Sequence, residues 1–578
     1  MNNVWQVSEL IKQVQKINTK FIVVTGGVCS SIGKGVLLSS LGVLLKNAAY
    51  SVSVIKWDPY LNVDPGTMSP LVHGEVFVTA DGAETDLDLG HYERLIELNV
   101  KRDSSVSSGQ IYQEVLDGER EGKFLGKCIQ MIPHVVGVLK RRLLEFALNH
   151  TVDFVLLEIG GTVGDIEGEI FLEAIRQLKM ELGSEFLMHA HLSYVPLLQW
   201  TGEIKTKPTQ HSVIELKRAG LTPDCLFLRA DKIIETHAID KLSVMCEVKQ
   251  DYIFQVLSFN PVYRVFVSLD SQGLGKRIQE YFKLPVIKES NIAEWKAYIQ
   301  QIEQSEKSVT IGLIAKYVGS NDPYISVIEA IKSAGYHNNR RINLVVIEAE
   351  LLSKDKENKE NSVAWQQLKG LEGIVVPGGF DYRGVEGKIL AAQWARENNI
   401  PYLGLCLGMQ VMIIEAARSL LFLSDANSSE FDTKTANPVI CMMSEQRDVT
   451  RKGASMRLGS FECTLTEGTQ AYQSYNKKTV LERHRHRYEV NNSYKAALES
   501  VGIVFSGMNK DMNLVEIAEL KNHPFMVAVQ FHPEFQSSPL KVHPLFKKFI
   551  EIVEKTSSIY KKQMPFVQHK RDEEELLG

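Results

Sequence analysis

Short runs of β-branched and other apolar residues alternate with helical patterns along this chain, and this alternation limits the possible fold more than any other feature. In the first half, the runs occupy residues 21–25, 51–56, 152–158, 189–195 and 225–229. In the second half, they occupy residues 309–314, 342–347, 373–376 and 402–405. Strands separated by helix-length segments build parallel sheets whose faces are covered by helices. The predicted fold class is therefore α/β, with parallel sheets.

The length of the chain requires more than one such sheet. A chain of 578 residues is too long for a single hydrophobic core. The pattern lapses over residues 289–308, a polar helical segment without a matching strand. We predict one domain over residues 20–288, a linker over 289–308 and a second domain over 309–557. Residues 1–19 are an N-terminal extension, and residues 558–578 have too few apolar residues to pack and are predicted to be a mobile tail.

Charge and cysteine usage argue against several classes of protein. The 65 Lys and Arg residues against 70 Asp and Glu give a net charge of −5, whereas nucleic-acid binders are usually basic. Seven cysteines without a Cys-x-x-Cys pair indicate neither a disulfide framework nor a zinc site. The first twenty residues lack the apolar run of a signal peptide, and no apolar segment is long enough to span a membrane. We expect a cytoplasmic protein with no nucleic-acid or membrane partner.

One cysteine has the surroundings of a nucleophile. Cys406 follows a predicted strand, precedes a helical pattern over 411–421, and has Gly404 and Gly408 two residues to either side. Such glycines let the backbone turn sharply from strand to helix and expose the nucleophile near a helix N-terminus, which favours the thiolate. His532 could act as its base, with Glu534 two residues on to orient the imidazole. The alternative is a buried core cysteine without chemistry.

The first strand leads into a glycine-rich loop over residues 26–35, followed by a helix over 36–48. Backbone N–H groups of such loops cradle phosphates, and Lys34 would meet the terminal phosphates. The loop departs from the usual phosphate-binding motif because Gly35 stands where a magnesium-binding hydroxyl belongs. The alternative is a plain structural turn.

The missing hydroxyl predicts that carboxylates elsewhere hold the metal. Glu158 closes a predicted strand, where a hard oxygen ligand can face the phosphates. Asp86 and Asp88 would share one face if their segment were extended, although either could be a solvated acid. Lys56, at the end of another strand, is a second candidate for the phosphates. The run Lys205-Thr-Lys-Pro-Thr-Gln210 before a helix would suit another triphosphate, or could be a solvated loop.

These motifs together resemble the CTP synthase family over roughly residues 20–555. The matching runs are Thr25-Gly-Gly-Val with Ser30-Ser-Ile-Gly-Lys-Gly35, Asp58-Pro-Tyr-Leu-Asn-Val-Asp-Pro-Gly-Thr-Met-Ser-Pro70, residues 73–79, 81–94, 158–167 and 205–212, Arg383-Gly-Val-Glu-Gly387, the Cys406 turn, residues 482–491 and Phe531-His-Pro-Glu-Phe535. The resemblance implies a P-loop-like, dethiobiotin-synthetase-like synthetase domain followed by a class I glutamine amidotransferase domain of flavodoxin-like fold. It implies ATP-dependent amination of UTP to CTP, with ammonia released from glutamine and a 4-phosphorylated UTP intermediate.

The resemblance also implies roles for individual residues. The catalytic residues of the amidotransferase would be Cys406, His532 and Glu534. The ATP contacts would be Ser31, Ile32, Gly33, Lys34, Gly35, Val36, Lys56 and Asp88. The magnesium ligands would be Asp88 and Glu158. The UTP or CTP contacts would be Ser30, Asp165, Ile166, Glu167, Lys205, Thr206, Lys207, Pro208, Thr209, Gln210 and Lys241. The glutamine contacts would be Gly379, Leu407, Gly408, Met409, Gln410, Glu430 and Arg487.

Regulation and assembly follow from the same resemblance. GTP would activate the glutaminase, and CTP would inhibit as a feedback product. The chain would form a homotetramer of dimers with nucleotide sites at subunit interfaces, and whether it also forms filaments stays open. His73 would lie near the gate of an ammonia passage.

Two other functions remain to be distinguished. A related ATP-dependent amidotransferase, such as a cobyrinate amide synthase, would share the phosphate loop and the cysteine turn but not the 58–66 and 205–210 runs. A non-catalytic assembly protein would be expected to lack Cys406, His532, Lys34 or Asp88, and all four are present.

Three segments differ from what the family pattern or composition alone would suggest. Asp381 stands where the family commonly has glycine, and we expect the loop to survive because aspartate tolerates positive φ. Residues 445–454 are shorter than expected for part of a lid over glutamine, which leaves the strength of GTP activation open. The basic run 483–487 suggests a nucleic-acid patch by composition, but its alternation fits a strand with the three arginines on one face.

Overall fold

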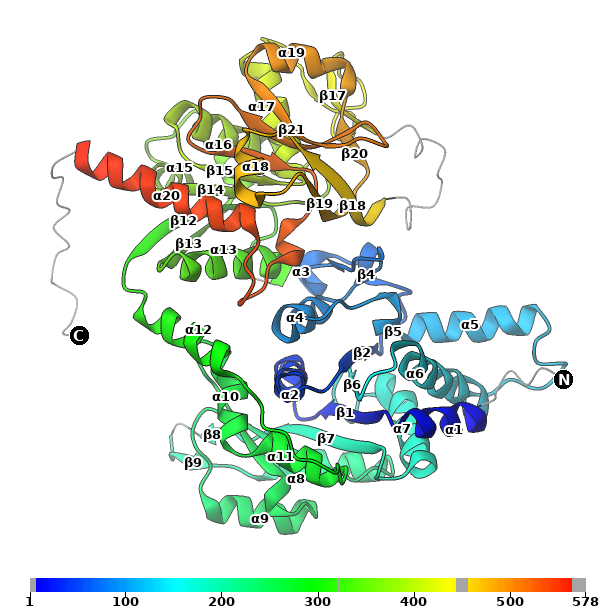
Figure 1. The fold of residues 1–578 in the computed structure, drawn as a ribbon. Helices are drawn as coiled ribbons and strands as arrows, with labels where there is room; N and C mark the ends of the chain where they lie inside the picture. The colour runs from blue at the N-terminus through cyan, green and yellow to red at the C-terminus, as the bar shows by residue number, and fades with distance from the viewer. Residues whose placement is uncertain (1–6, 199, 320–321, 443–455, 564–578) are drawn as a thin grey trace. The chain divides into compact units, whose positions relative to one another are not determined.

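The computed structural model describes residues 7–198, 200–319, 322–442 and 456–563, and the chain divides into two compact units after Glu303. Helices and strands alternate along both units (Figure 1). None of the helices in these described ranges is long and apolar enough to cross a membrane.

The first unit is built on a seven-stranded sheet in which every neighbouring pair is parallel. In spatial order the strands are β11 (Ile253–Leu257), β10 (Cys225–Ala230), β7 (Leu187–Tyr194), β1 (Lys20–Gly26), β6 (Phe154–Ile159), β2 (Val52–Asp58) and β5 (Ser105–Ser107). Five of these strands overlap the five runs predicted for this half. β5 and β11 were not predicted.

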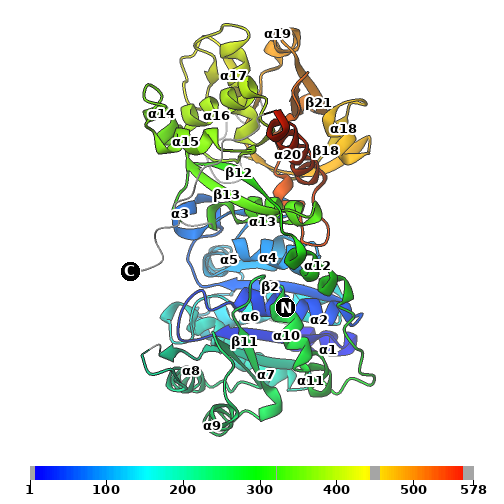
Figure 2. The same cartoon turned by 90° about the vertical axis from the view of Figure 1, so that its left-hand side faces the viewer.

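Helices cover both faces of this sheet (Figure 2). Buried side chains of α1 (Val7–Ile17), α6 (Val136–His150) and α7 (Glu169–Leu182) form one core with alternate residues of the central strands, such as Phe21 and Val23. On the other face, α2 (Lys34–Asn47) packs against α4 (Leu87–Ile96) and α10 (Arg264–Ser271). The remaining helices of the unit are α3 (Pro70–His73), α5 (Ser108–Arg120), α8 (Lys207–Arg218), α9 (Thr236–Cys246), α11 (Leu274–Tyr281) and α12 (Ala293–Gln304), and its short strand pairs are β3 (Phe77–Val78) with β4 (Glu84–Thr85) and β8 (Leu197–Leu198) with β9 (Glu203–Ile204).

Helix α12 occupies most of the segment predicted as a linker. Its Trp295 is buried and packs against Tyr263 and Phe266, with ring centroids 5.6 and 4.9 Å away. This helix is therefore packed rather than freely extended.

The second unit is built on a nine-stranded mixed sheet. In spatial order the strands are β13 (Arg341–Glu348), β12 (Ser308–Ala315), β14 (Gly373–Val376), β15 (Tyr402–Leu405), β23 (Met526–Val529), β22 (Leu514–Leu520), β21 (Ile503–Asn509), β18 (Arg457–Leu465) and β19 (Thr479–His486). The run from β13 to β23 is parallel, whereas β22, β21, β18 and β19 extend it in antiparallel fashion. The parallel part was predicted apart from β23. Of the antiparallel extension, only the end of β19 was predicted, from the alternation over residues 483–487.

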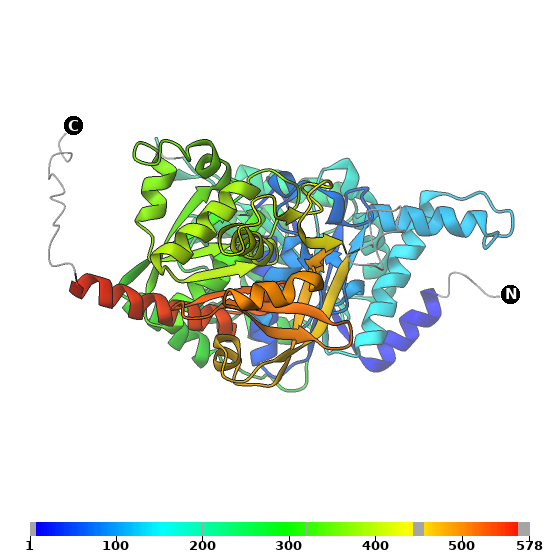
Figure 3. The same cartoon turned by 90° about the horizontal axis from the view of Figure 1, so that it is seen from above.

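Two layers of helices enclose this sheet. On one face lie α14 (Ala349–Lys354), α15 (Val363–Lys369), α16 (Val385–Asn398) and α17 (Leu407–Ser419). On the other face lie α13 (Ile325–His337), α18 (Gln470–Tyr475) and α20 (Pro544–Gln563). Figure 3 shows α20, in red, on the opposite side of the sheet from the yellow-green α16 and α17. The unit also contains α19 (Lys495–Ser500) and a small sheet of β16 (Asn427–Ser428), β17 (Pro438–Met442) and β20 (Tyr488–Val490).

Some predictions fall at the edges of the described chain. Helix α20 continues to Gln563, into the segment predicted as a tail, and residues 564–578 lie outside the described residues. The predicted lid segment 445–454 also lies outside the described residues. So do residues 1–6 of the predicted N-terminal extension.

Candidate functional site

Cys406 lies at the sharp turn between β15 and α17. Its backbone has φ 52° and ψ −101°, a left-handed conformation that is unfavourable for a residue with a Cβ. A Cβ added at Gly408 would lie 2.2 Å from the carbonyl oxygen of Val376, and one at Gly404 would lie 2.7 Å from that of Gly408. Only glycine fits at these two positions, so the predicted strand–turn–helix is confirmed. The helix begins at Leu407, earlier than the predicted 411.

Two buried side chains from the segment after β23 complete a group with Cys406. Nδ1 of His532 lies 2.7 Å from Oε1 of Glu534. A Cβ at Gly378 would lie 2.9 Å from Cε1 of His532 and 3.6 Å from Cβ of Cys406. The imidazole and the thiol therefore face the same glycine loop, with Nε2 left for the sulfur.

The charges of this group favour a protonated His532. Burial by itself lowers the pKa of His532, but the charges of Glu534 and Cys406 outweigh burial and raise that pKa to about 10. A protonated imidazole beside a cysteine stabilises the thiolate, which is the nucleophilic form. The side-chain amide of Gln530, which sequence reasoning did not single out, donates to the sulfur at 3.6 Å.

The loop that follows β14 lies beside Cys406 and is held by two lysines. Nζ of Lys388 donates to the carbonyl oxygens of Pro377 at 2.7 Å and Gly378 at 3.3 Å. Nζ of Lys316 donates to the carbonyl oxygens of Phe380 and Asp381.

The backbone of this loop has three residues with positive φ, the last being Gly384 at 70°. Gly379 has φ 156°, and Asp381 has φ 73°. The expectation that aspartate would tolerate positive φ at position 381 is therefore confirmed.

The residues predicted to bind glutamine divide into two groups. Leu407, Gly379, Glu430 and Arg487 lie around the loop: a Cβ at Gly379 would be 3.7 Å from Cδ2 of Leu407. Burial raises the pKa of Glu430, while the nearby cations Lys316 and Arg487 oppose that shift.

The other predicted glutamine contacts have buried side chains with structural partners. Met409 belongs to the hydrophobic core, and Nε2 of Gln410 donates to the carbonyl oxygen of Tyr488 at 3.1 Å. These two residues can reach a ligand only through their backbone.

The basic run 483–487 is a strand, as its alternation predicted. Strand β19 ends at His486, one residue before Arg487. Arg483, His484 and His486 are buried, and the guanidinium of Arg485 lies 4.7 Å from the centroid of the Phe380 ring. The run is therefore not an exposed basic patch.

In the first unit, the glycine-rich loop joins β1 to α2. Val28 and Ser31 have positive φ values of 79° and 55°, and a β-branched residue in that conformation marks a strained, closely specified loop. Nζ of Lys34, in the first turn of α2, donates to the carbonyl oxygen of Gly161 at 2.6 Å. A Cβ at Gly27 would lie 1.6 Å from Oγ of Ser212 in α8, so the loop is packed directly on that helix.

Two carboxylates approach the first turn of α2, as the missing hydroxyl predicted. A Cβ at Gly35 would lie 3.2 Å from Oδ1 of Asp88 and 3.7 Å from Oε2 of Glu158. Burial and the charge of Asp88 raise the pKa of Glu158 to about 7, and Oη of Tyr92 donates to Glu158 at 2.5 Å. Two hard oxygen donors beside a phosphate loop suit magnesium, which takes one or two carboxylates and completes its shell with phosphates and water. Within the described ranges, no group of three or more His, Cys, Asp or Glu side chains is arranged to hold a metal on its own.

Lys56, at the end of β2, lies among these acids. Its Nζ contacts Asp88, and lies 3.2 Å from both Asp58 and Asp86. Burial alone would lower the pKa of Lys56, but the surrounding carboxylates raise it well above the ordinary value.

Asp86 and Asp88 were predicted to share one face if their segment were extended. The segment is not extended. Asp86 caps α4 by accepting from the N–H of Asp88, which lies in the first helical turn. Both acids reach Lys56 because the helix begins there. Asp86 also pairs with Nε2 of His73 at 3.0 Å, which raises the pKa of His73.

The Lys205–Gln210 run lies at the start of α8, as expected. Lys207 is exposed, but the hydroxyl of Thr209 donates to the carbonyl oxygen of Tyr194 at 3.0 Å, and Thr206 accepts from Nε2 of Gln210. The hydroxyls predicted to meet an anion therefore already bind protein groups. Lys241 is exposed on α9.

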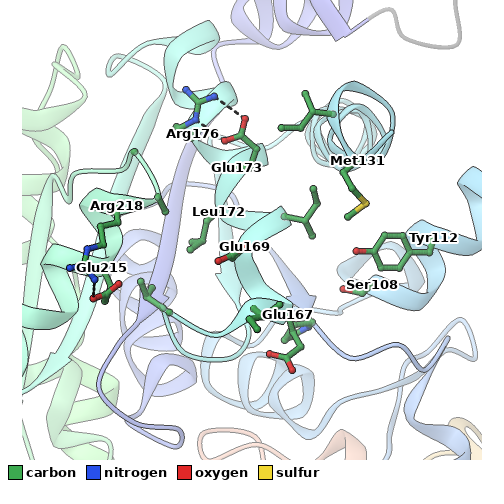
Figure 4. Close-up of a pocket in the computed structure, with 18 of the residues that line it drawn as sticks. Ser108, Tyr112, Met131, Glu167, Glu169, Leu172, Glu173, Arg176, Glu215 and Arg218 are labelled. Carbon is green, nitrogen blue, oxygen red and sulfur yellow. Dashed lines mark hydrogen bonds and ion pairs between the residues drawn. The ribbon is translucent and has the colours of Figure 1, made fainter. Parts of the chain in front are cut away.

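Ile166 and Glu167 line a groove of about 1210 Å³ on the first unit (Figure 4), whereas Asp165 does not. Side chains of α5, α7 and α8 form its walls, among them Tyr112, Arg176 and Arg218, and Glu167 lies at its edge. Neither the Lys205–Gln210 run nor Lys241 lines this groove. The structure therefore does not bring all the predicted UTP residues into one pocket.

Comparison with known proteins decides the family. The family model described as CTP synthase N-terminus matches residues 20–284, and the class-I glutamine amidotransferase model matches residues 321–552. A CTP synthase of Caldanaerobacter subterraneus is 49% identical over 532 residues, which cover 92% of this chain and 98% of the relative. The chain belongs to the CTP synthase family. A CTP synthase of Bacillus subtilis has the same identity and coverage.

CTP synthases are ligases of pyrimidine biosynthesis that use ATP and glutamine to convert UTP to CTP, and membership assigns this chain to that reaction. Among solved structures, the glutaminase domain of Trypanosoma brucei CTPS with bound acivicin is 36% identical, covers 43% of this chain and 94% of that chain, and has a TM-score of 0.40. The predicted family and the α/β fold class are confirmed.

Proposed function

We propose that this CTP synthase divides its reaction between the two units: the second releases ammonia from glutamine, and the first aminates UTP that has been phosphorylated at the 4-oxygen. In terms of residues, we propose that 20–288 form the synthetase domain and 309–557 the amidotransferase domain. The observation that supports this most strongly is the Cys406–His532–Glu534 group at the turn of the second sheet.

In the glutaminase step, Cys406 attacks the side-chain amide carbon of glutamine. A carbon–sulfur bond forms, the carbon–nitrogen bond breaks, and His532 gives the leaving ammonia a proton. Water then hydrolyses the glutamyl thioester with His532 acting as base. The N–H groups of Gly379 and Leu407 stabilise the oxyanion that forms on the amide oxygen.

Recognition of glutamine would use the two charged side chains beside the loop. We propose that Arg487 binds the α-carboxylate and Glu430 the α-ammonium group, because they carry the complementary charges. The buried Met409 and Gln410, with Gly408, would support the turn rather than contact glutamine through their side chains.

In the synthetase step, Lys34 and Lys56 bind the phosphates of ATP while the 4-oxygen of UTP attacks the terminal phosphorus. The backbone of residues 31–36 cradles the phosphates. Asp88 and Glu158 would hold magnesium, which when bound would neutralise charge on the transferring phosphoryl group. Ammonia then adds at C4 and phosphate leaves.

UTP and its product CTP would share one site, because they differ only at position 4 of the ring. We propose that Ser30, Asp165–Glu167, Lys205–Gln210 and Lys241 form this site, and that CTP inhibits by occupying it. Lys205 and Lys207 carry the charge for the triphosphate.

We also propose assembly into a homotetramer and activation by GTP. The groove beside Glu167 supports assembly, because the large apolar side chains of Leu61 and Ile166 on its wall are 72% and 82% exposed and would be covered by another subunit. Size-exclusion chromatography with light scattering, with and without nucleotides, tests the assembly.

The whole function is tested by mixing the protein with UTP, ATP, magnesium and glutamine and following the uracil-to-cytosine absorbance change. We expect CTP to form, dependent on every component. Glutamine and ATP consumption without a change in UTP would assign the chain to another amidotransferase reaction. Nucleotide binding without turnover would assign it to a non-catalytic assembly protein.

A further inference from the structure

Lys388 is a lysine with no exposed surface in the second unit. It lies in the first turn of α16, has 0% relative exposure, and is among the largest fully buried side chains of the described chain. Lysine is almost never fully buried unless a carboxylate pairs with it. Within the described residues, Nζ of Lys388 has no such ion pair and donates instead to the carbonyl oxygens of Pro377 and Gly378.

Burial of this amine works against the stability of the fold. Desolvation lowers the pKa of Lys388 well below its usual value, and the nearby charge of Lys316 lowers it further, with only Cys406 acting in the opposite direction. An apolar side chain of similar length could fill the same space without this cost. The amine is therefore poorly explained by packing alone.

The two carbonyl groups that Lys388 binds belong to the loop beside the nucleophile. Gly378 lies against both His532 and Cys406, and Gly379 follows it. The carbonyl of Gly378 and the N–H of Gly379 belong to one peptide unit. Because that unit is planar and trans, its carbonyl oxygen and its N–H point in opposite directions. Fixing the oxygen on Lys388 therefore fixes the direction of the N–H of Gly379.

We propose that Lys388 is a positioning residue of the glutaminase reaction: it holds the Gly378–Gly379 peptide so that the N–H of Gly379 is directed at the oxyanion formed when Cys406 attacks. This inference rests on the proposed function of the second unit. The loop itself cannot supply the same restraint, since glycine has the greatest backbone freedom of any residue. Lys388 thus acts on the transition state through the loop and does not touch glutamine.

The test is the Lys388→Met variant of the full-length enzyme, which keeps an unbranched side chain as far as Cε and removes the N–H donors. The matched control is Lys369→Met, at an exposed helical lysine of the same unit. We expect kcat for glutamine hydrolysis to fall by about tenfold to a hundredfold, because one oxyanion donor is worth that much or more. We expect the KM for glutamine to change by less than about threefold, since the oxyanion exists only after attack.

Three further readouts separate positioning from a structural role. Ammonia-dependent CTP synthesis should be unchanged, and the midpoint of thermal unfolding should stay the same or rise, because a buried amine has been removed. Lys388→Gln, which keeps an N–H donor, should recover part of the lost kcat. These three results together with the fall in kcat support the proposal.

Several results would overturn it. Glutamine hydrolysis by Lys388→Met at the wild-type kcat, or a higher KM with kcat unchanged, would show that the amine does not direct the oxyanion donor. If neither Lys388→Met nor Lys388→Gln folds, Lys388 is needed for folding and the positioning role is overturned. Absence of glutamine hydrolysis in the wild-type enzyme would instead overturn the proposed function itself, so the two failures are distinguishable.

Discussion

At Cys406, three unfavourable conditions meet in one residue: left-handed backbone, burial, and a charge on the sulfur when it is a nucleophile. The backbone crowding and the charge are each offset by a specific neighbour. Glycines relieve the crowding at the turn, and a protonated His532 compensates the charge. His532 in turn depends on Glu534, because burial alone would remove its proton. The chain of dependence runs from carboxylate to imidazole to thiol.

This dependence predicts the effect of Glu534→Gln on the reactivity of the thiol. Without the carboxylate, burial lowers the pKa of His532, the imidazolium is lost, and less thiolate is present at a given pH. The pH midpoint for inactivation of glutamine hydrolysis by iodoacetamide should therefore rise by about one unit or more. Loss of activity is the required readout, because Cys29 and Cys128 are exposed and would also be alkylated.

The control for this experiment is Glu499→Gln, which changes an exposed carboxylate of the same unit. Its inactivation profile should match that of the wild type. If Glu534→Gln also matches, the carboxylate does not sustain the ion pair.

A second prediction at this scale concerns Asp88 and Glu158. If these carboxylates hold magnesium beside Gly35, Asp88→Asn or Glu158→Gln should abolish CTP synthesis from glutamine and from ammonia alike. Glutamine hydrolysis should fall much less, because the residues proposed for it lie in the other unit. The amide oxygen of Glu158→Gln can still accept the hydrogen bond from Tyr92, so the local fold should persist.

Asp117→Asn, at an exposed position on α5, serves as the control for the metal prediction. Rates of CTP formation with each nitrogen source, measured over a range of magnesium concentrations, give the answer. Near-normal ammonia-dependent synthesis in both variants would mean that the metal is held elsewhere.

Among the elements, the strands buried between helices were the easiest to predict. β14 and β15 have the predicted bounds, because their apolar runs end abruptly at proline, glycine or the nucleophile turn. Strand β5 has only three residues and gives no periodic signal. The antiparallel β18 was missed because its charged residues suggest exposure, whereas Arg457 is buried and paired with Glu489 and Glu516. Only the end of β19 was predicted, from the alternation over residues 483–487.

The functional residues were likewise predictable only where the sequence carried a local signal. Motifs identified Cys406, His532 and Lys34, since their chemistry depends on local spacing. Lys388 had no such signal, because a lysine in a helix is normally solvent-exposed and its partners are carbonyl groups of a different segment. The hydrogen bond from the hydroxyl of Thr209 to the carbonyl oxygen of Tyr194 likewise could not be predicted from the sequence, because it depends on the tertiary structure.

The turn between β15 and α17 carries a prediction of its own. In Gly408→Ala the new Cβ would lie 2.2 Å from the carbonyl oxygen of Val376, so the start of α17 must move and Cys406 with it. We expect glutamine-dependent synthesis to fall by about a hundredfold, as displacements of about 1 Å in catalytic groups can cause. Ammonia-dependent synthesis should be retained.

Gly370→Ala is the matched control, because its Cβ would lie 3.5 Å from the nearest atom, an ordinary contact. The steady-state rates of this variant with both nitrogen sources should be close to those of the wild type. A Gly408→Ala enzyme with normal glutamine-dependent rates would contradict the close packing of the turn.

On the scale of the whole molecule, each unit contains one of the two groups of side chains to which a reaction step is assigned above. The phosphate loop, its lysines and the two carboxylates all belong to the unit before Glu303, and the cysteine group belongs to the unit after it. Free ammonia is scarce at neutral pH because it is largely protonated, so a synthetase gains from a glutaminase in the same chain. We propose that ammonia is the only chemical link between the two reactions.

The most direct test of that claim is the rate of CTP formation by Cys406→Ala, measured once with glutamine and once with ammonium salt at a pH that supplies free ammonia. Loss of a nucleophile can reduce a rate by up to ~10⁶, so glutamine-dependent synthesis should vanish. Ammonia-dependent synthesis should proceed at the wild-type rate, since Cys406 has no part in the amination of UTP. An equal loss with both nitrogen sources would contradict the division of the reaction between the two units.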